Sequence, residues 1–398
     1  MLNDLFLKAV PLLKAIEARG FEAVFVGGSV RDYILGRDIH DVDIATSALP
    51  EEVKAIFPST IDIGIQHGTV MVLYGGDSYE ITTYRTEGEY SDFRKPNEVT
   101  FIRSLKEDLK RRDFTMNSMA LDKAGELYDP FGGKKAILEK RIDTVGKASE
   151  RFSEDALRML RALRFASQLS FSCSGEIVHS LKENHALLDH ISVERITSEF
   201  EKLIDGRNAI QAFKLLIETD LYMHLPGFAK KKEALISASQ IPFHHLSTVN
   251  EKWAILLYKM VQSDEVESLL RQWKLPVKQI RTIRTIVQLL EESFSGDPYS
   301  MIMKGIEASQ SAIRINCLLK NEKEDEALAH LQKKWQALPI RSAAELAVNG
   351  RDLIEWSEKK QGPWMKDVLH ELVKRVVEGH VGNTKEEIFR EVRKCNLI

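Results

Sequence analysis

Two acidic residues separated by a single residue, Asp41 and Asp43, follow a glycine pair and an arginine early in this chain. The run that ends at Asp43 reads VGGSVRDYILGRDIHDVD. Two neighbouring carboxylates repel each other, and a divalent cation that prefers oxygen ligands removes this cost. Arg31 can hold a phosphate in its forked guanidinium. The run therefore indicates a site for a metal-bound triphosphate, whereas an isolated Asp-x-Asp would more often be an exposed polar strand.

Short elements must position these residues. Residues 21–26 are apolar and predict a strand, which the glycine pair ends. Ser29 is a candidate N-cap for a short helix, and residues 41–46 predict a second strand. Side chains alternate along a strand, so the two aspartates are expected on one face. The glycine turn lets backbone N–H groups approach phosphate oxygens at the positive end of a helix.

A second group of charged residues follows a predicted helix over residues 153–169. Asp155, Arg158, Arg161 and Arg164 recur at every third position along one side of it. Successive guanidiniums this close are mildly unfavourable in a free helix, and an anionic ligand would remove the cost. A solvated charged face explains the stretch equally well when it is considered alone. Arg164 lies nearest the apolar stripe, which favours a structural role for it.

Asp155 and Arg158 also make a chemically useful pair. Cytosine and adenine both present an amino donor beside a ring-nitrogen acceptor, which a carboxylate and a guanidinium can satisfy together. Uracil and guanine present the opposite polarity and would leave buried groups unpaired, at about 1–3 kcal/mol each. The pair is therefore a physical means of selecting C and A together.

A third candidate group is the run KRRDFTMN over residues 110–117. Arg112 is a candidate ligand for the triphosphate or the ribose. Asp113 is a candidate partner for an arginine or a support for the metal-binding aspartates. A basic helix end remains the alternative explanation for this run.

The whole chain has 398 residues, a net charge of −3 and 43% hydrophobic residues. This length suggests two to four domains, and the charge excludes a uniformly basic nucleic-acid coat. Three widely separated cysteines argue against a disulfide framework and favour a reducing, cytoplasmic location. No apolar run is long enough to span a membrane. A strand-rich first third precedes an almost wholly helical remainder, which predicts an α+β protein with a small mixed α/β head.

Taken together and in this order, these motifs resemble those of the class II, bacterial-type tRNA nucleotidyltransferases that add CCA, within the DNA polymerase beta-like superfamily. The resemblance covers Val26 to about Ile196. It also includes the turn over 129–133, which matches a hinge, and the run over 192–195, which matches a motif that steadies the helices. The polar segment 86–97 matches a flexible loop associated with the switch from C to A addition.

This resemblance implies two Mg²⁺ ions at Asp41 and Asp43, the catalytic residues. It implies that Asp155 and Arg158 act as a protein template for the incoming base. Further nucleotide-binding positions are implied at matching residues, namely Gly28, Arg31, Arg112, Arg161 and Arg164. A third carboxylate is frequent in the superfamily, and Glu80 is a candidate that the sequence does not separate from a structural glutamate.

The resemblance further implies four parts: a catalytic head over 1–145, a neck over 146–207, a body over 208–295 and a tRNA-binding tail over 296–398. The expected partners are CTP, ATP and the acceptor arm and 3′ end of tRNA, and the oligomeric state stays open. A-only or CC-only enzymes and bacterial poly(A) polymerases share the head and neck motifs and remain alternatives. A helical RNA-binding scaffold with an inactive head is the alternative outside this class.

Overall fold

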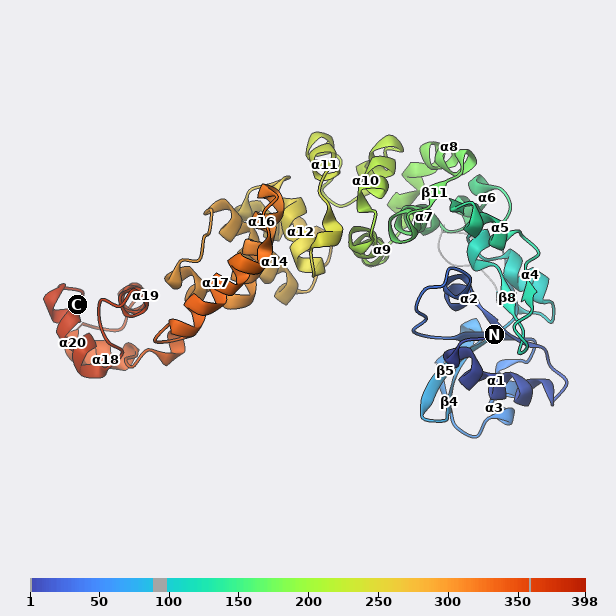
Figure 1. Cartoon of the computed structure of the whole chain (residues 1–398), viewed down its shortest axis with the longest axis horizontal. Helices are drawn as coiled ribbons and strands as arrows, with labels where there is room; N and C mark the ends of the chain where they lie inside the picture. The colour runs from blue at the N-terminus through green and yellow to red at the C-terminus, as the bar shows by residue number, and fades with distance from the viewer. Residues whose placement is uncertain (1, 89–98, 358) are drawn as a thin grey trace. The chain divides into compact units, whose positions relative to one another are not determined.

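The protein separates into two units, Met1–His244 and His245–Ile398 (Figure 1). The structure is a computed structural model, and it describes residues 2–88, 99–357 and 359–398. Each unit is considered by itself. The predicted division into head, neck, body and tail is finer than this two-way split and stays a prediction.

The first unit begins with a mixed sheet of seven strands among the described residues, in the order β3-β4-β5-β2-β1-β8-β9. Within it, β2 and β5 run parallel, and the other neighbours run antiparallel. The strands are β1 (Ala23–Val26), β2 (Asp43–Thr46), β3 (Thr60–Gly64), β4 (Thr69–Tyr74), β5 (Asp77–Thr83), β8 (Ala120–Leu121) and β9 (Leu127–Tyr128). Two short ladders pair β6 (Arg85–Glu87) with β7 (Val99–Phe101), and β10 (Arg141–Ile142) with β11 (Ser172–Cys173).

Local sequence explains the central part of this sheet. All four residues of β1 are buried, as the apolar run predicts. Strands β4 and β5 form a hairpin around Gly75 and Gly76, whose φ angles are 63° and 91°. Both angles are positive, which favours glycine in a tight hairpin turn. The pairing of β2 with β5 sets Ile44 opposite Ile81, so the preceding residues, Asp43 and Glu80, lie at the same end of the two strands.

Helices make up the rest of the first unit (Figure 1). They are α1 (Asp4–Glu17), α2 (Gly27–Ile34), α3 (Pro50–Ile56), α4 (Leu105–Lys110), α5 (Gly133–Leu138), α6 (Ala148–Glu154), α7 (Leu157–Leu169), α8 (Gly175–Asn184), α9 (Val193–Asp205), α10 (Ala209–Glu218) and α11 (Lys232–Ala238). Short 3₁₀ helices are η1 (Ile65–His67), η2 (Thr115–Asn117), η3 (His185–His190) and η4 (Leu221–His224), with η5 (Phe243–His245) at the unit boundary. Helix α7 packs on α9 and α10 through its apolar side, which includes Leu160 and Leu163. Each such buried leucine contributes about 1.5–3 kcal/mol of hydrophobic free energy.

The second unit is helical throughout its described residues. Its helices are α12 (Val249–Tyr258), α13 (Ser263–Gln272), α14 (Val277–Glu291), α15 (Pro298–Lys304), α16 (Ile306–Lys320), α17 (Glu324–Ala337), η6 (Ala343–Glu345), α18 (Gly350–Ser357), α19 (Trp364–Val377) and α20 (Lys385–Lys394). The fully buried Trp253 and Trp273 pack edge to face, with ring centroids 5.0 Å apart. In the described part of the chain, no helix has the length and apolar character needed to cross a bilayer. The mixed-sheet head and helical remainder confirm the predicted α+β fold.

Three predicted boundaries were wrong. Helix α2 begins at Gly27, and Ser29 lies inside it, where its hydroxyl donates to the Val26 carbonyl at 2.9 Å. Strand β2 begins at Asp43, which leaves Asp41 in the preceding loop. The helix predicted over 153–169 is two helices, because Asp155 has extended backbone angles of φ −138° and ψ 102°. Of the predicted flexible segment 86–97, residues 89–97 lie outside the described residues.

Candidate active site

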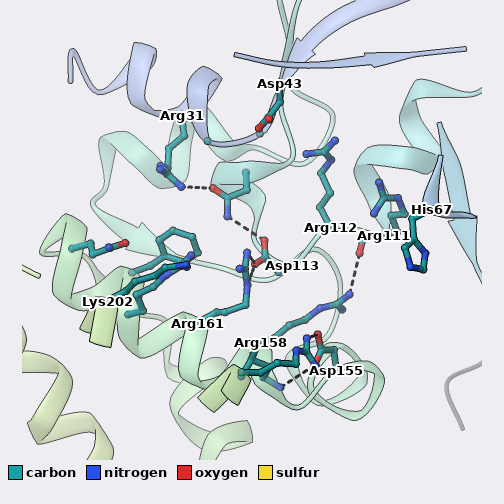
Figure 2. A pocket seen from close by; sticks show the side chains of 18 of the residues that line it. Arg31, Asp43, His67, Arg111, Arg112, Asp113, Asp155, Arg158, Arg161 and Lys202 are labelled. Atoms are coloured by element: carbon teal, nitrogen blue, oxygen red, sulfur yellow. Dashed lines mark hydrogen bonds and ion pairs between the residues drawn. The ribbon is translucent and has the colours of Figure 1, made fainter. Parts of the chain in front are cut away.

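A cavity of about 840 Å³ lies between the glycine turn at the start of α2, the start of β2, and helix α7 (Figure 2). Its described lining carries nine cationic side chains: Arg31, Arg85, Arg111, Arg112, Arg158, Arg161, Arg164, Arg195 and Lys202. It carries three acidic ones: Asp43, Asp113 and Asp155. This excess of positive charge suits a polyanionic ligand, and the volume lies in the usual range for a small-molecule site.

The structure brings most of the predicted site residues to this one cavity. Its lining includes eight of them: Gly28, Arg31, Asp43, Arg112, Asp155, Arg158, Arg161 and Arg164. The ninth, Asp41, is exposed in the loop before β2 and is not part of the lining. The expectation that both aspartates share the face of one strand was therefore wrong, because the strand does not extend back to Asp41.

Asp43 sits among other acids. The pKa of the Asp43 carboxyl is raised to about 6, chiefly by burial and also by the negative charges of Asp41 and Glu80, while the nearby Arg112 opposes the shift. Gly27 has a φ of +75°, and a Cβ on it would meet Asp43 Oδ2 at 2.9 Å. A side chain at Gly27 would therefore be strained and would crowd the carboxylate.

Arg31 is held at the mouth of the glycine turn by two acceptors. Its Nε and Nη2 donate to the carboxylate of Asp32 at 3.1 and 2.8 Å, and its Nη1 donates to Asn117 Oδ1 at 2.8 Å. Asn117 Nδ2 in turn donates to Asp113 Oδ1 at 3.1 Å, and Arg161 Nε donates to Asp113 Oδ2 at 2.7 Å. This chain of hydrogen bonds joins α2 to α7 across the cavity (Figure 2).

Asp113 is the buried centre of that network. Burial alone would raise the pKa of its carboxyl, but the charge of Arg161 and the hydrogen bonds from Asn117 and Arg161 lower the pKa to about 2. The carboxylate is therefore fixed in its charged form. It orients Arg161 toward the cavity, as expected for an arginine partner.

Arg111 and Arg112 share one buried acid. Their Nη2 atoms lie 2.9 and 3.2 Å from the carboxylate of Asp108, which is 1% exposed. Asp108 thereby holds Arg112 next to Asp43, whose pKa Arg112 lowers. The Nε of Arg112 is buried without a hydrogen-bond partner among the described residues, so this guanidinium can still donate.

Asp155 and Arg158 face the cavity, but each has another partner. Asp155 accepts hydrogen bonds from Arg195 Nη1 and Nη2 at 3.3 and 2.7 Å. Arg158 donates to Glu154 Oε2 at 2.6 Å and to the Arg111 carbonyl at 3.2 Å. Asp155 also accepts from the backbone N–H of Leu157 at 3.1 Å, which helps to start α7. The pair is thus held by local contacts to Glu154 and Leu157 together with tertiary contacts to Arg111 and Arg195.

Arg164 is mainly buried. Burial and the neighbouring Arg161 lower the pKa of its guanidinium to about 10, while Glu199 opposes this shift. Its Nη1 lies 3.1 Å from Glu199 Oε2, and its guanidinium stacks over the Phe165 ring at 4.2 Å. The guanidiniums of Arg31 and Arg161 lie at 5.1 and 5.6 Å from the same ring. Arg164 therefore combines a structural role with a place in the cavity wall.

Sequence reasoning missed four residues that support the site: Asp108, Asn117, Arg195 and Glu199. Arg195 belongs to the run over 192–195, for which only a role in steadying the helices was expected. Asp108 and Asn117 lie in or beside the run over 110–117, and Arg195 and Glu199 lie on α9. No local sequence pattern predicts which residue each of them binds. In the described ranges, no group of three or more His, Cys, Asp or Glu side chains is arranged as a metal site.

The sheet, the acid–arginine cavity and the helical remainder together define a nucleotidyltransferase. Three family descriptions match the chain: "Poly A polymerase head domain" over residues 23–143, "Probable RNA and SrmB- binding site of polymerase A" over 170–232, and "tRNA nucleotidyltransferase domain 2 putative" over 244–392.

Relatives that match over the full length of the chain show which kind of nucleotidyltransferase it resembles. The CCA-adding enzyme of Bacillus licheniformis is 46% identical over 100% of both chains, and that of Geobacillus sp. strain WCH70 is 45% identical over 100% of this chain and 99% of its own. The crystal structure of the Bacillus stearothermophilus CCA-adding enzyme in complex with CTP is similar with a TM-score of 0.93 at 42% identity, over 99% of this chain and 98% of that one. The chain belongs to the family of CCA-adding enzymes. The predicted identification as a bacterial class II, template-independent RNA nucleotidyltransferase is confirmed, and the family implies dependence on a divalent metal.

Proposed function

We propose that this enzyme adds C, C and A to the 3′ end of tRNA from CTP and ATP, and that pyrophosphate is released. The observation that carries the proposal is that Asp43 lines the same cavity as Asp155 and Arg158. One bound nucleotide can therefore meet an acidic cation site and a base-reading pair at once. The similarity to an enzyme crystallised with CTP supports this assignment.

The triphosphate is assigned to the arginine side of the cavity. Arg31 and Arg112 flank the glycine turn, where Gly28 allows the backbone to approach phosphate oxygens. Arg161 and Arg164 face the cavity from α7. These cations offset the charge of the triphosphate, and their own acidic partners hold them in position.

Two Mg²⁺ ions are proposed at Asp41 and Asp43. The donor set fits, because burial and two acidic neighbours raise the pKa of Asp43, and bound cations would relieve that clustered negative charge. Mg²⁺ commonly takes one or two protein carboxylates and fills its other positions with phosphate oxygens and water. Glu80, at the same end of the neighbouring strand, is proposed as the third carboxylate.

The proposed reaction is a displacement at phosphorus. The 3′-oxygen of the tRNA forms a bond to the α-phosphorus, the bond from that phosphorus to the bridging oxygen breaks, and pyrophosphate departs with its electrons. The metal ions, when bound, activate the hydroxyl and neutralise the triphosphate. The arginines hold the departing pyrophosphate, and the proton of the hydroxyl passes to solvent.

Base selection is assigned to Asp155 and Arg158. The Asp155 carboxylate has about four acceptor sites, so it can accept from a base amino group while Arg195 remains bound. Arg158 supplies the donor for the ring nitrogen. The predicted domains keep their assignments in this proposal: 1–145 performs the chemistry, 146–207 selects the base, 208–295 is the helical body, and the tail 296–398 binds tRNA. A cytoplasmic location is proposed from the few, unpaired cysteines.

A primer-extension assay tests this function. Purified enzyme is given tRNAs that end before, within and after CCA, with CTP alone, ATP alone or both. Addition that stops after C-C-A supports the proposal. An unbounded A tail would identify a poly(A) polymerase, and addition of only C-C or only A would identify the partial enzymes.

Asp41→Ala and Asp43→Ala test whether the head is catalytic. Both are expected to abolish incorporation and to leave tRNA binding in place, because the aspartates would hold the metal ions and not the acceptor arm. Asp4→Ala, at an exposed position of α1, is the matched control. Unchanged incorporation in the Asp43 variant would favour a scaffold role for this chain.

A further inference from the structure

A second hollow of about 520 Å³ adjoins the active-site cavity. Its walls come from the loop after α2, which supplies Arg37 and Asp38, and from the end of α7 and the turn after α9, which supply Gln168 and Arg207. All of these residues belong to the first unit. We call this space the side hollow; Arg37, Asp38 and His40 lie within the run that ends at Asp43, but the sequence pattern assigns none of them a role.

The side hollow connects directly with the proposed chemistry. Gln168 lines both the hollow and the active-site cavity. His40 lines the hollow and immediately precedes Asp41. The hollow is therefore next to the cavity on the side where the exposed Asp41 lies.

Two arginines from different segments of the chain line the hollow. Arg37 and Arg207 are both exposed, and their guanidiniums have no hydrogen bond or ion pair with any residue in the described ranges. This differs from the active-site arginines described above, most of which are held by an acid. Asp38 adds one negative charge, so the hollow keeps a net positive charge and two uncommitted five-donor groups.

The geometry of phosphoryl transfer separates the attacking strand from the leaving pyrophosphate. The attacking and leaving oxygens lie roughly in line on opposite sides of the phosphorus. Because the arginine-lined cavity takes the triphosphate and the departing pyrophosphate, the attacking strand must approach the aspartates from another direction. Its last nucleotides are single-stranded, and such strands are bound by cations that follow the phosphates.

We infer that the side hollow binds the phosphates of the last nucleotides of the RNA primer, with Arg37 and Arg207 as the contacting residues. The inference rests on the proposed function, and it adds the place where the acceptor end lies during addition. Gln168, between the two spaces, then separates the strand from the incoming nucleotide.

Steady-state kinetics with tRNA and CTP varied separately test the inference. Arg37→Ala and Arg207→Ala are each expected to raise the KM for tRNA by about three- to tenfold and to leave the KM for CTP unchanged, because each removes one phosphate contact. Each should also reduce the slope of log affinity against log salt by about 0.7, the value for one phosphate on a single strand. Asp38→Asn removes a repulsive charge and should lower the KM for tRNA.

A truncated RNA locates the effect. A tRNA that lacks its last four nucleotides should bind the wild type and Arg37→Ala with equal affinity, because the strand no longer reaches the hollow. Arg19→Ala, an exposed arginine at the end of α1, is the control and should change neither KM. A raised KM for CTP would assign the hollow to the triphosphate or pyrophosphate, and unchanged KM values for both substrates would also overturn the inference. Failure of the wild type to add C and A would instead count against the proposed function, since RNA binding is measured independently.

Discussion

Arg195 on α9 donates hydrogen bonds from two guanidinium nitrogens to the Asp155 carboxylate, at 3.3 and 2.7 Å. The two residues are forty positions apart, and Asp155 lies in the break between α6 and α7. The carboxylate that is proposed to read the base is thus held by a neighbouring helix. The direction in which the Asp155 carboxylate points therefore depends on how α7 and α9 pack together.

Changing Asp155 to Asn should weaken base selection. The amide can donate as well as accept, so it tolerates uracil and guanine. The preference for CTP over UTP, measured as the ratio of kcat/KM values, should fall by about 10- to 100-fold, the range for losing one buried polar discrimination. Glu150→Gln, on the exposed side of α6, is the control and should keep the wild-type ratio. An unchanged ratio in Asp155→Asn would show that this carboxylate does not read the base.

Asn117 should act as a positioning residue. It accepts from Arg31 at 2.8 Å and donates to Asp113 at 3.1 Å, so it sets the angle between the phosphate-binding arginine and the buried acid. Asn117→Ala should lower kcat/KM for CTP by about 10- to 100-fold, as for loss of support to a binding group. The dissociation constant for tRNA should remain that of the wild type.

Asn117→Asp separates the two contacts of this residue. The new carboxylate still accepts from Arg31 but repels Asp113 and should therefore destabilise the first unit. Asn184→Ala is the control, because the side-chain hydrogen bonds of Asn184 within the described residues go to Ser180 of the same helix, α8. A normal KM for CTP in Asn117→Ala would contradict the positioning role.

Asp113 should make stability depend on pH. Its folded pKa of about 2 lies below the usual 3.8, so its ionised form stabilises the fold. This contribution is fully present above about pH 4 and is lost as the pH falls toward 2; its size is about 2 kcal/mol. Asp113→Asn should therefore destabilise the first unit at pH 7, and most of this difference should disappear only near pH 2.

Hydrogen exchange of peptides from α7 measures that difference. The five tryptophans all lie in residues 245–398, so their fluorescence reports the second unit and serves as an internal control. Equal protection of α7 in the wild type and Asp113→Asn at pH 7 would show that the buried pair with Arg161 contributes no stability.

Glu80→Gln tests the third carboxylate. If Glu80 supports the metal site beside Asp43, the Mg²⁺ concentration for half-maximal incorporation should rise by about tenfold or more, as for loss of a supporting ligand. Asp77→Asn, an exposed acid at the start of the same strand, is the control. A shift no larger than that of the control would leave Glu80 as a structural glutamate.

Sequence alone determined the local features of this protein. Strand β1 and the β4–β5 hairpin follow from apolar runs and glycine turns, because these patterns act within a few residues. The sequence also indicated which residue types form the site. An Asp-x-Asp beside a glycine turn suggests binding of a metal-bound triphosphate, and a row of arginines suggests binding of an anion. Eight of the nine predicted site residues line one cavity.

Tertiary structure decided which side chains of the site pair with one another. The helix expected through Asp155 is broken there, where the carboxylate is paired with Arg195 and caps the start of α7. Asn117 became part of the site only because α2, η2 and α7 meet around Asp113. The Asp155–Arg195, Asp113–Arg161 and Arg31–Asn117 contacts join positions 40, 48 and 86 residues apart, and periodicity or spacing carries no information over that distance. They depend on how buried apolar faces pack, and packing is a property of the whole fold.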